Sequence, residues 1–361
     1  MTFVLVIHGG AGSHVYKDRD KEIYAGVIKD LLFCGYNLLR NGEKSINVAQ
    51  KIIKIMEDSA LFNAGRGSVK SIDGTMQLYA SIMDGSTLKF GAVSNVSKIK
   101  NPILMARFIM DYTNHTKINC AAAEKLAKLN GIKLIDPNIY YSSNYNMDQY
   151  SSALSEESQR TMDTIQMILS EDAEKSPMDT IQRMLSEDSY RSPMDTTRRM
   201  LSKDSEKSPM DTTQGMLSED SHRSPMDTIG VIALDIYGNF AVASSTGGIE
   251  TKLPGRSSDI TDLGAGVYAN NKTCCIACSG EGEFIARTVV AYDISAQIEY
   301  QNKNIFEAAY FSLQKAHHLN NNKPVGGIIG IDTFGNICII HDTVSMLCGY
   351  VKSSADFSIF I

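Results

Sequence analysis

The run IGVIAL at 229–234 constrains the fold more than any other stretch, because six consecutive residues carry no polar side chain. A strand with one exposed face alternates apolar and polar residues, so an unbroken run is typical of a strand buried on both faces. A second apolar run, FVLVI at 3–7, ends in a glycine-rich turn and predicts another buried strand. Strand and helix signals alternate through 1–135 and again through 229–361.

Helices are expected where apolar residues recur at helical spacing. The segments 22–39 and 45–58 have this spacing, and Gly42 lies where the first helix should stop. Pro102 suits the first turn of a further helix, since the N–H that proline lacks would have no partner there. In the second half, helices are expected over 282–299 and 306–319. Hairpins should fold at 237–239 and 334–336.

Five copies of Met-Asp-Thr separate the two halves, each 16 residues after the last. They begin at Met162, Met178, Met194, Met210 and Met226. Apolar residues in each unit have the spacing of a short helix. The units cannot join into one amphipathic helix, because 16 residues at roughly 100° each rotate the apolar stripe by about 160° from one unit to the next. The proline in each later unit also interrupts the hydrogen-bond ladder. We therefore interpret residues 140–227, rich in Ser, Asp, Glu and Lys, as a flexible linker without a function of its own.

Composition excludes several classes of partner. The net charge of −6 disfavours nucleic acid and membrane surfaces, and no apolar stretch is long enough to span a membrane. The odd count of seven cysteines, without an export signal, favours reduced thiols and an intracellular location, in cytoplasm or nucleus. Cys275 and Cys278 form a lone CxxC, and no second ligand pair is nearby, so we expect a strand there, with no metal and no cofactor.

Only the fifth repeat leads directly into a strand, because the apolar run follows Thr228. If the bond between Asp227 and Thr228 is cut, the freed α-amine can serve as base for the threonine hydroxyl. Such an amine has a pKa of about 7.7–8.0, so a useful fraction is neutral at physiological pH. Thr228 is therefore a candidate nucleophile, although Asp-Thr before a strand, taken alone, favours an ordinary strand start.

A set of short segments gives this hypothesis a family. They are HGGAG at 8–12, NAGRGS at 63–68, ASIMDGSTLKFGAV at 80–93, NPILMAR at 101–107, DTIGVIALD at 227–235, SSTGG at 244–248, PGRSSD at 254–259, GAGVYANN at 264–271 and SGEGE at 279–283. Together they resemble the threonine branch of the N-terminal-nucleophile (Ntn) hydrolases, which includes type 2 asparaginases, isoaspartyl peptidases and threonine aspartase (taspase). The segments cover both halves in order and skip the linker.

The resemblance implies an α+β fold, a four-layer αββα sandwich interrupted by the linker before the nucleophile. The domain would consist of residues 1–139 and 228–361. Self-cleavage between Asp227 and Thr228 would give an α/β heterodimer that can dimerise further. No cofactor is implied.

The resemblance also assigns roles to individual residues. Thr246 matches a second hydroxyl beside the nucleophile, and Arg256 matches the arginine that grips a substrate carboxylate. Ser279 and Gly280 match the oxyanion hole. Asn63 matches a residue of the loop that borders the nucleophile.

Specificity is divided between two members of the family. Asp227 before the nucleophile resembles taspase, whereas Asp259 resembles the residue with which asparaginases hold the α-amine of a small substrate. Tyr79 and the pair Ser257-Ser258 depart from both patterns. We favour an endopeptidase that cuts proteins after aspartate, at internal Asp-Gly sites. The alternatives are an asparaginase or isoaspartyl peptidase acting on small β-aspartyl substrates, and an unprocessed scaffold without activity.

Overall fold

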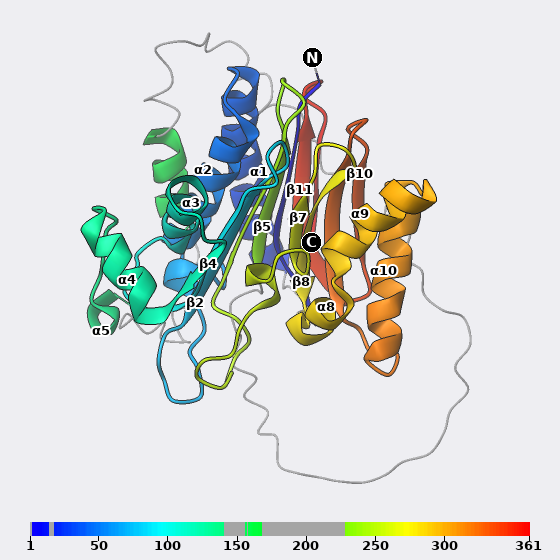
Figure 1. The fold of residues 1–361 in the computed structure, drawn as a ribbon. Helices are drawn as coiled ribbons and strands as arrows, with labels where there is room; N and C mark the ends of the chain where they lie inside the picture. Colours follow the sequence, from blue (N-terminus) through cyan, green and yellow to red (C-terminus); the bar gives the residue numbers. More distant parts are fainter. Residues whose placement is uncertain (1, 14–17, 141–155, 157, 168–227) are drawn as a thin grey trace.

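The computed structural model describes residues 2–13, 18–140, 156, 158–167 and 228–361. Within them the strands form two sheets, with the order β12-β11-β1-β5-β6-β2-β3-β4 in the larger and β10-β9-β8-β7 in the smaller (Figure 1). The bounds are Val4–Gly12 (β1), Leu78–Asp84 (β2), Phe90–Val96 (β3), Lys117–Asn119 (β4), Ile229–Leu234 (β5), Phe240–Thr246 (β6), Val267–Ala269 (β7), Cys274–Gly280 (β8), Gly326–Asp332 (β9), Ile337–His341 (β10), Ser345–Lys352 (β11) and Phe357–Phe360 (β12).

Strand β5 lies inside the larger sheet, antiparallel to both β1 and β6. Its side chains alternate between two cores: Ile232 and Leu234 pack between the sheets, whereas Val231 and Ala233 pack on the opposite face. All six residues of β5 are buried. The prediction of a strand buried on both faces is therefore confirmed.

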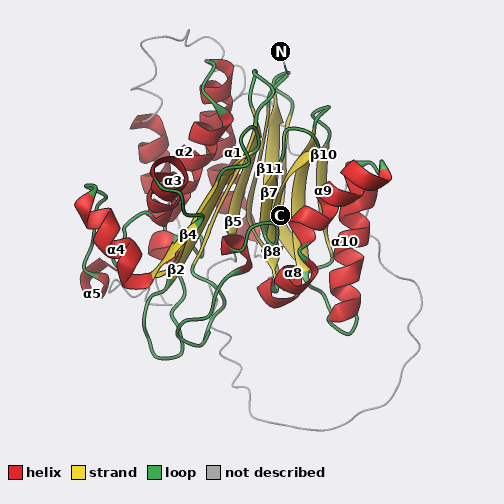
Figure 2. Ribbon diagram, viewed as in Figure 1, coloured by secondary structure: helices red, strands yellow, loops and turns green. Residues whose placement is uncertain are grey.

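Helices cover the outer face of each sheet, as Figure 2 shows. One apolar core joins the larger sheet to the first group of helices, a second lies between the sheets, and a third joins the smaller sheet to the second group. The first group is Asp18–Arg40 (α1), Ser45–Asp58 (α2), Pro102–Tyr112 (α3), Cys120–Leu129 (α4) and the short Pro137–Tyr140 (α5). The second group is Gly282–Thr288 (α8), Val290–Gln301 (α9) and Ile305–Leu319 (α10). The fold is of the expected mixed α and β class.

Local sequence signals explain several element ends. Pro102 occupies the first turn of α3, as predicted. Asn304 caps α10, because its side-chain oxygen accepts a hydrogen bond from the Glu307 backbone N–H at 3.0 Å. The hairpin between β5 and β6 folds where expected, and the Asp235 carboxylate accepts hydrogen bonds from two backbone N–H groups of its turn.

Two segments differ from expectation. The single helix predicted over 282–299 is broken into α8 and α9 at Val289, whose φ of 51° is left-handed and ends the first helix. Within the expected linker, residues 158–167 are helical. There Ile165 is buried, and the Thr161 hydroxyl is hydrogen-bonded to that of Ser59 at 3.2 Å. The first Met-Asp-Thr copy therefore lies in a packed helix, while copies two to four and Asp227 lie outside the described residues.

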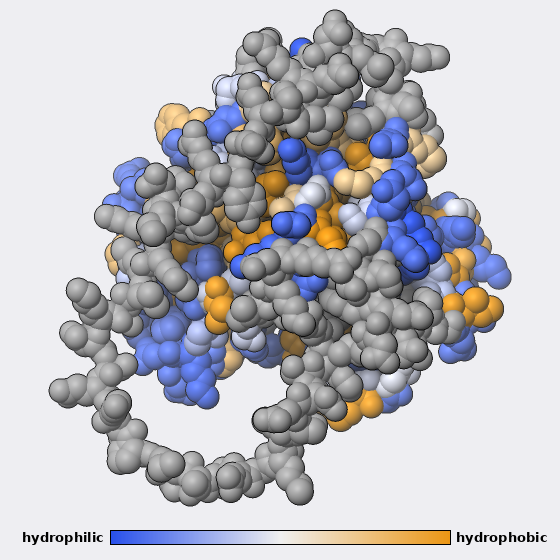
Figure 3. Space-filling model, turned by 180° about the vertical axis from the view of Figure 1, so that it is seen from behind, coloured by the Kyte–Doolittle hydropathy of each residue, from blue (hydrophilic) through white to orange (hydrophobic). Residues whose placement is uncertain are grey.

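Most of the described surface visible in Figure 3 is hydrophilic, with smaller apolar areas between the polar ones. None of the helices among the described residues combines the length and the apolar character needed to cross a membrane. Cys275 and Cys278 lie in β8, as the strand interpretation predicted, and none of the seven cysteines, all within the described residues, forms a disulfide.

The core between the sheets should carry much of the stability. We expect Ile232→Ala to lower the free energy of unfolding by about 2–5 kcal/mol, because it removes buried methyl groups and leaves a cavity. The matched control is Ile72→Ala, since that side chain is 66% exposed. Urea unfolding followed by circular dichroism measures both. Equal midpoints for the two variants would contradict this account of the core.

Candidate active site

Thr228 lies immediately before β5, at the end of that strand where β5 pairs with the last residues of β6. It is only 8% exposed. Because Ile229 pairs with Ser245, the next step of the antiparallel register brings Thr228 beside Thr246, the last residue of β6. Thr246 is buried, and its hydroxyl accepts a hydrogen bond from the Gly248 backbone N–H at 2.9 Å. The two threonines thus lie side by side at the ends of two central strands of the larger sheet.

Asn63 joins a neighbouring loop to the turn after β6. Its side-chain nitrogen donates to the Gly248 carbonyl at 2.7 Å, and its backbone carbonyl accepts from the Gly247 N–H at 2.8 Å. Its side-chain oxygen accepts from the Val69 N–H at 3.0 Å. A Cβ at Gly247 would lie 2.4 Å from that oxygen, so only glycine permits this approach. The loop is therefore held firmly against the Thr246 turn.

Ser279 and Gly280 end strand β8 of the smaller sheet, facing the end of β1. The Ser279 hydroxyl oxygen accepts a hydrogen bond from the Ala11 N–H at 3.1 Å, which leaves the hydroxyl proton free to be donated elsewhere. A cavity of about 480 Å³ opens at this point. Gly280, Ala11 and Asn63 all line it, so the structure brings Gly280 and the Asn63 loop to one space.

Arg256 and Asp259 lie together beside α8. A Cβ at Gly282 would be 3.0 Å from Arg256 Nη2 and 2.6 Å from Asp259 Oδ1, so both side chains flank this glycine. The pKa of Asp259 is raised to about 6 because the carboxyl is buried, although the charge of Arg256 opposes the effect. Asp259 is 6% exposed, and its Oδ2 has no hydrogen-bond partner among the described residues.

Three further residues near these groups were not predicted as site residues. Glu283 binds the Arg256 guanidinium through two hydrogen bonds of 2.8 and 2.9 Å. Lys252 is buried, which lowers its pKa to about 8, and its Nζ donates to the Val69 carbonyl at 3.3 Å. Burial, opposed only in part by the Thr228 backbone, lowers the pKa of His8 to about 3. Glu283 lies in the SGEGE segment, and Lys252 lies between SSTGG and PGRSSD. Nothing in the sequence alone indicates that Glu283 contacts Arg256 or that Lys252 contacts Val69.

Glu57 is a buried carboxyl behind the nucleophile strands. Its Oε1 accepts hydrogen bonds from the Ser245 hydroxyl at 2.7 Å and from the Ile103 N–H at 3.1 Å. Burial raises its pKa to about 8, against these two donors. It therefore joins α2, α3 and β6 directly beneath Thr246.

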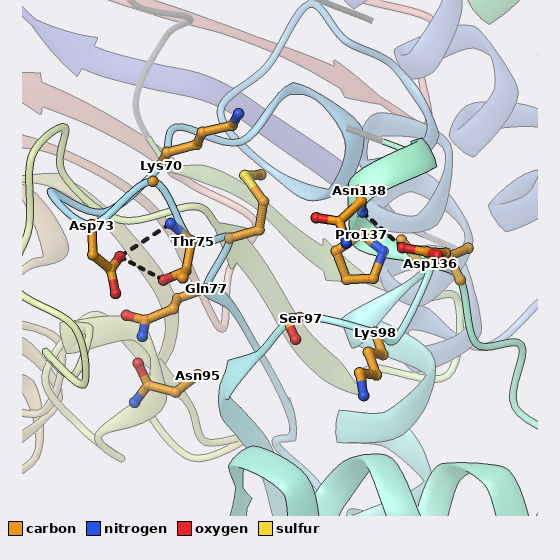
Figure 4. Close-up of a pocket in the computed structure, with 13 residues that line it drawn as sticks. Lys70, Asp73, Thr75, Gln77, Asn95, Ser97, Lys98, Asp136, Pro137 and Asn138 are labelled. Carbon is orange, nitrogen blue, oxygen red and sulfur yellow. Dashed lines mark hydrogen bonds between the residues drawn. The ribbon is translucent and has the colours of Figure 1, made fainter. Parts of the chain in front are cut away.

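A larger hollow of about 1120 Å³ lies elsewhere, between the 70–77 loop, β3 and α5 (Figure 4). None of the predicted site residues lines it, so volume alone would mislead. Gln77 and Asn95 line it and also reach the arginine loop: Gln77 accepts from the Gly255 N–H, and Asn95 accepts from the Tyr79 hydroxyl. Within the described residues, no group of three or more His, Cys, Asp or Glu side chains is placed to hold a metal ion.

Comparison with known proteins gives this arrangement its class. The family described as asparaginase matches residues 1–361. A putative isoaspartyl peptidase/L-asparaginase of Dictyostelium discoideum is 37% identical over 353 residues, which cover 96% of this chain and 93% of the relative. The isoaspartyl peptidase of Escherichia coli is 32% identical over 347 residues (95% and 91%), and the isoaspartyl peptidase/L-asparaginase of Bos taurus is 32% identical over 346 residues (96% and 92%).

These matches define a hydrolase of the N-terminal-nucleophile type. Within that class, the chain belongs to the asparaginase family. The predicted resemblance is confirmed at this level. The relatives are named for isoaspartyl peptidase and asparaginase activity and not for taspase, so they favour our alternative over the endopeptidase that we preferred.

Glu57 should make stability depend on pH. Its folded pKa of about 8 exceeds the ordinary value of 4.5, so its contribution is complete below about pH 4.5 and is lost as pH rises through about 8. We expect Glu57→Gln, which keeps an acceptor for Ser245, to remove a decline on the order of a few kcal/mol over that range.

Urea midpoints at several pH values between 5 and 8.5 test this expectation. Glu299→Gln, at an exposed position on α9, is the matched control. An unchanged pH slope in the Glu57 variant would show that the carboxyl is ionised in the folded protein.

Proposed function

We propose that the chain cuts itself between Asp227 and Thr228 and then hydrolyses small β-aspartyl substrates, as an isoaspartyl peptidase/L-asparaginase. The observation that carries the proposal is the pair at Gly282: a guanidinium beside a buried carboxylate, one oxygen of which has no partner in the part of the chain that the structure describes. Such a pair suits the carboxylate and ammonium groups of an amino-acid head. The names of the relatives support the same substrate class.

Self-cleavage would begin with attack of the Thr228 hydroxyl on the Asp227 carbonyl. The acyl group passes from nitrogen to oxygen, which breaks the peptide bond and frees the Thr228 amine; water then hydrolyses the ester to release the Asp227 carboxylate and restore the Thr228 hydroxyl. In the next reactions the amine takes the hydroxyl proton while Thr228 attacks the β-carbonyl of a substrate. The amine returns this proton to the leaving ammonia or amino-acid amine as the substrate C–N bond breaks, and water then hydrolyses the Thr228 ester to release aspartate. Ser279, whose proton is free to be donated, and the Gly280 N–H would stabilise the oxyanion.

The sheet order supports a stable α/β heterodimer after the cut. Strand β1, from the proposed 1–139 half, lies between β11 and β5 of the 228–361 half, and β6 pairs with β2. Separation of the two chains would therefore break the larger sheet at three strand pairs, β11–β1, β1–β5 and β6–β2. Residues 140–227 would be the linker between the two halves, although its helix over residues 158–167 packs against the core through Ile165.

The second candidate function is an endopeptidase that cuts proteins after aspartate. It is favoured by Asp227 itself, because a site that cuts after this residue must accommodate an aspartyl side chain. Its protein substrates would present an internal Asp-Gly bond.

The nucleophile is tested by Thr228→Ala. We expect one uncut chain and a loss of activity on the order of 10⁴-fold or more, because no other group replaces an N-terminal nucleophile. The matched control is Thr212→Ala in the fourth repeat, which should be cut normally. Intact-mass and N-terminal measurements read both, and cleavage of the Thr228 variant would refute the assignment.

Specificity is tested with three substrates: L-asparagine, a β-aspartyl dipeptide and a peptide with an internal Asp-Gly bond. We expect turnover of the two small substrates, and we expect Asp259→Ala to raise their KM by about tenfold or more, since a buried charge partner of the ammonium is lost. Exclusive cleavage of the Asp-Gly peptide, unaffected by Asp259→Ala, would instead establish the endopeptidase.

A further inference from the structure

The Arg256 guanidinium has two acidic neighbours but is bound by only one of them in the described structure. Nε and Nη2 donate to Glu283 Oε1 and Oε2 at 2.8 and 2.9 Å, a two-pronged ion pair along one edge of the fork. Asp259 lies just across Gly282, yet its Oδ2 is unpartnered among the described residues and its Oδ1 accepts only from Ser258 there. The arginine side chain is 12% exposed, whereas that of Glu283 is 50% exposed.

Arg256 is also held by its backbone. The Tyr79 hydroxyl donates to the Arg256 carbonyl at 2.8 Å, and Tyr79 itself is completely buried. Tyr79 pairs with Thr246 across the sheet, so the arginine loop is attached to the nucleophile turn. A Cβ at Gly248 would lie 3.4 Å from Arg256 Nη1. The end of the fork that Glu283 does not bind thus lies close to Gly248, two residues from Thr246.

We propose that Glu283 and Tyr79 are positioning residues that keep the two substrate anchors apart. Glu283 occupies the Nε–Nη2 edge, so that Nη1 receives the α-carboxylate and Asp259 keeps an oxygen for the α-ammonium group. This inference rests on the proposed function and deepens it. It assigns the site to substrates with both groups free on the aspartyl unit.

The physical reason is competition for one cation. Without Glu283, the nearest carboxylate to the guanidinium is Asp259, and a buried arginine without a partner is costly. The fork would turn toward Asp259, and the two anchors would neutralise each other. A substrate would then have to separate a buried ion pair before binding. Arginine also has many rotamers, and Glu283 and Tyr79 restrict them before the substrate binds.

The same geometry predicts a change in the titration of Asp259. Arg256, Glu283, Ser258 and the buried Cys278 thiol are its polar or titratable neighbours. The charge of Glu283 raises the pKa of Asp259, and that of Arg256 lowers it. Removal of Glu283 should therefore lower the pKa of Asp259 for two reasons: a nearby negative charge is lost, and Arg256 is released to approach the Asp259 carboxylate.

The experiment uses the self-cleaved enzyme and ammonia release from L-asparagine. For Glu283→Ala we expect KM to rise by about tenfold with kcat within about twofold, because the anchors bind substrate but do not react. The acid limb of the kcat/KM profile should move below its wild-type position near pH 6. Glu283→Gln should be intermediate, and Glu299→Ala is the matched surface control.

Tyr79→Phe provides an independent measurement, since it removes the hydroxyl that donates to the Arg256 backbone carbonyl. It should raise KM for L-asparagine in the same way. Both variants should affect L-asparaginamide less than L-asparagine, because the amide lacks the α-carboxylate and loses only the contact of its ammonium group with Asp259. An unchanged or lower KM in Glu283→Ala, or equal effects on both substrates, would overturn the inference. If the wild-type enzyme hydrolyses no small β-aspartyl substrate, the proposed function fails first, and the two failures are thereby distinguished.

Discussion

The pairing of β5 with β1 and β6 is the constraint on which the rest of the site depends. A strand buried on both faces cannot shift by one residue without moving every side chain into the wrong core. That fixed register places Thr228 beside Thr246 and sets Ser245 over the Glu57 carboxyl. The other neighbour of β5 is β1, whose Ala11 N–H donates a hydrogen bond to Ser279 of the smaller sheet.

Ionisable side chains near the Thr228 and Thr246 ends of β5 and β6 are used in two different ways. Glu57 is buried with a pKa near 8 and acts as a neutral hydrogen-bonding group beneath the nucleophile turn. Arg256, Asp259 and Glu283 form a group in which one cation faces two carboxylates. In such a group the strongest pair decides which oxygen remains available, and here the solvent-exposed Glu283 takes the fork while the buried Asp259 does not.

The sequence predicts those features that follow from local patterns. The apolar run at 229–234, the proline at the start of α3 and the two hairpins depend on neighbours in the chain, and they were foreseen. The break at Val289 was not, because an apolar stripe continues through it and only tertiary packing selects the left-handed residue. Glu283 and Tyr79 are distant from Arg256 in sequence, so their contacts with it could be known only from the folded structure.

The repeats can be understood from where the nucleophile is anchored. Thr228 needs only the strand that follows it, because the register of β5 is set by its two neighbours in the sheet, β1 and β6. If residues 140–227 are a linker, lengthening it by one 16-residue unit, from about 70 residues, adds about 0.2 kcal/mol of loop-closure entropy. A duplication of that size is almost neutral for folding. Copies of Met-Asp-Thr can therefore accumulate upstream without disturbing the one threonine that the sheet holds in place.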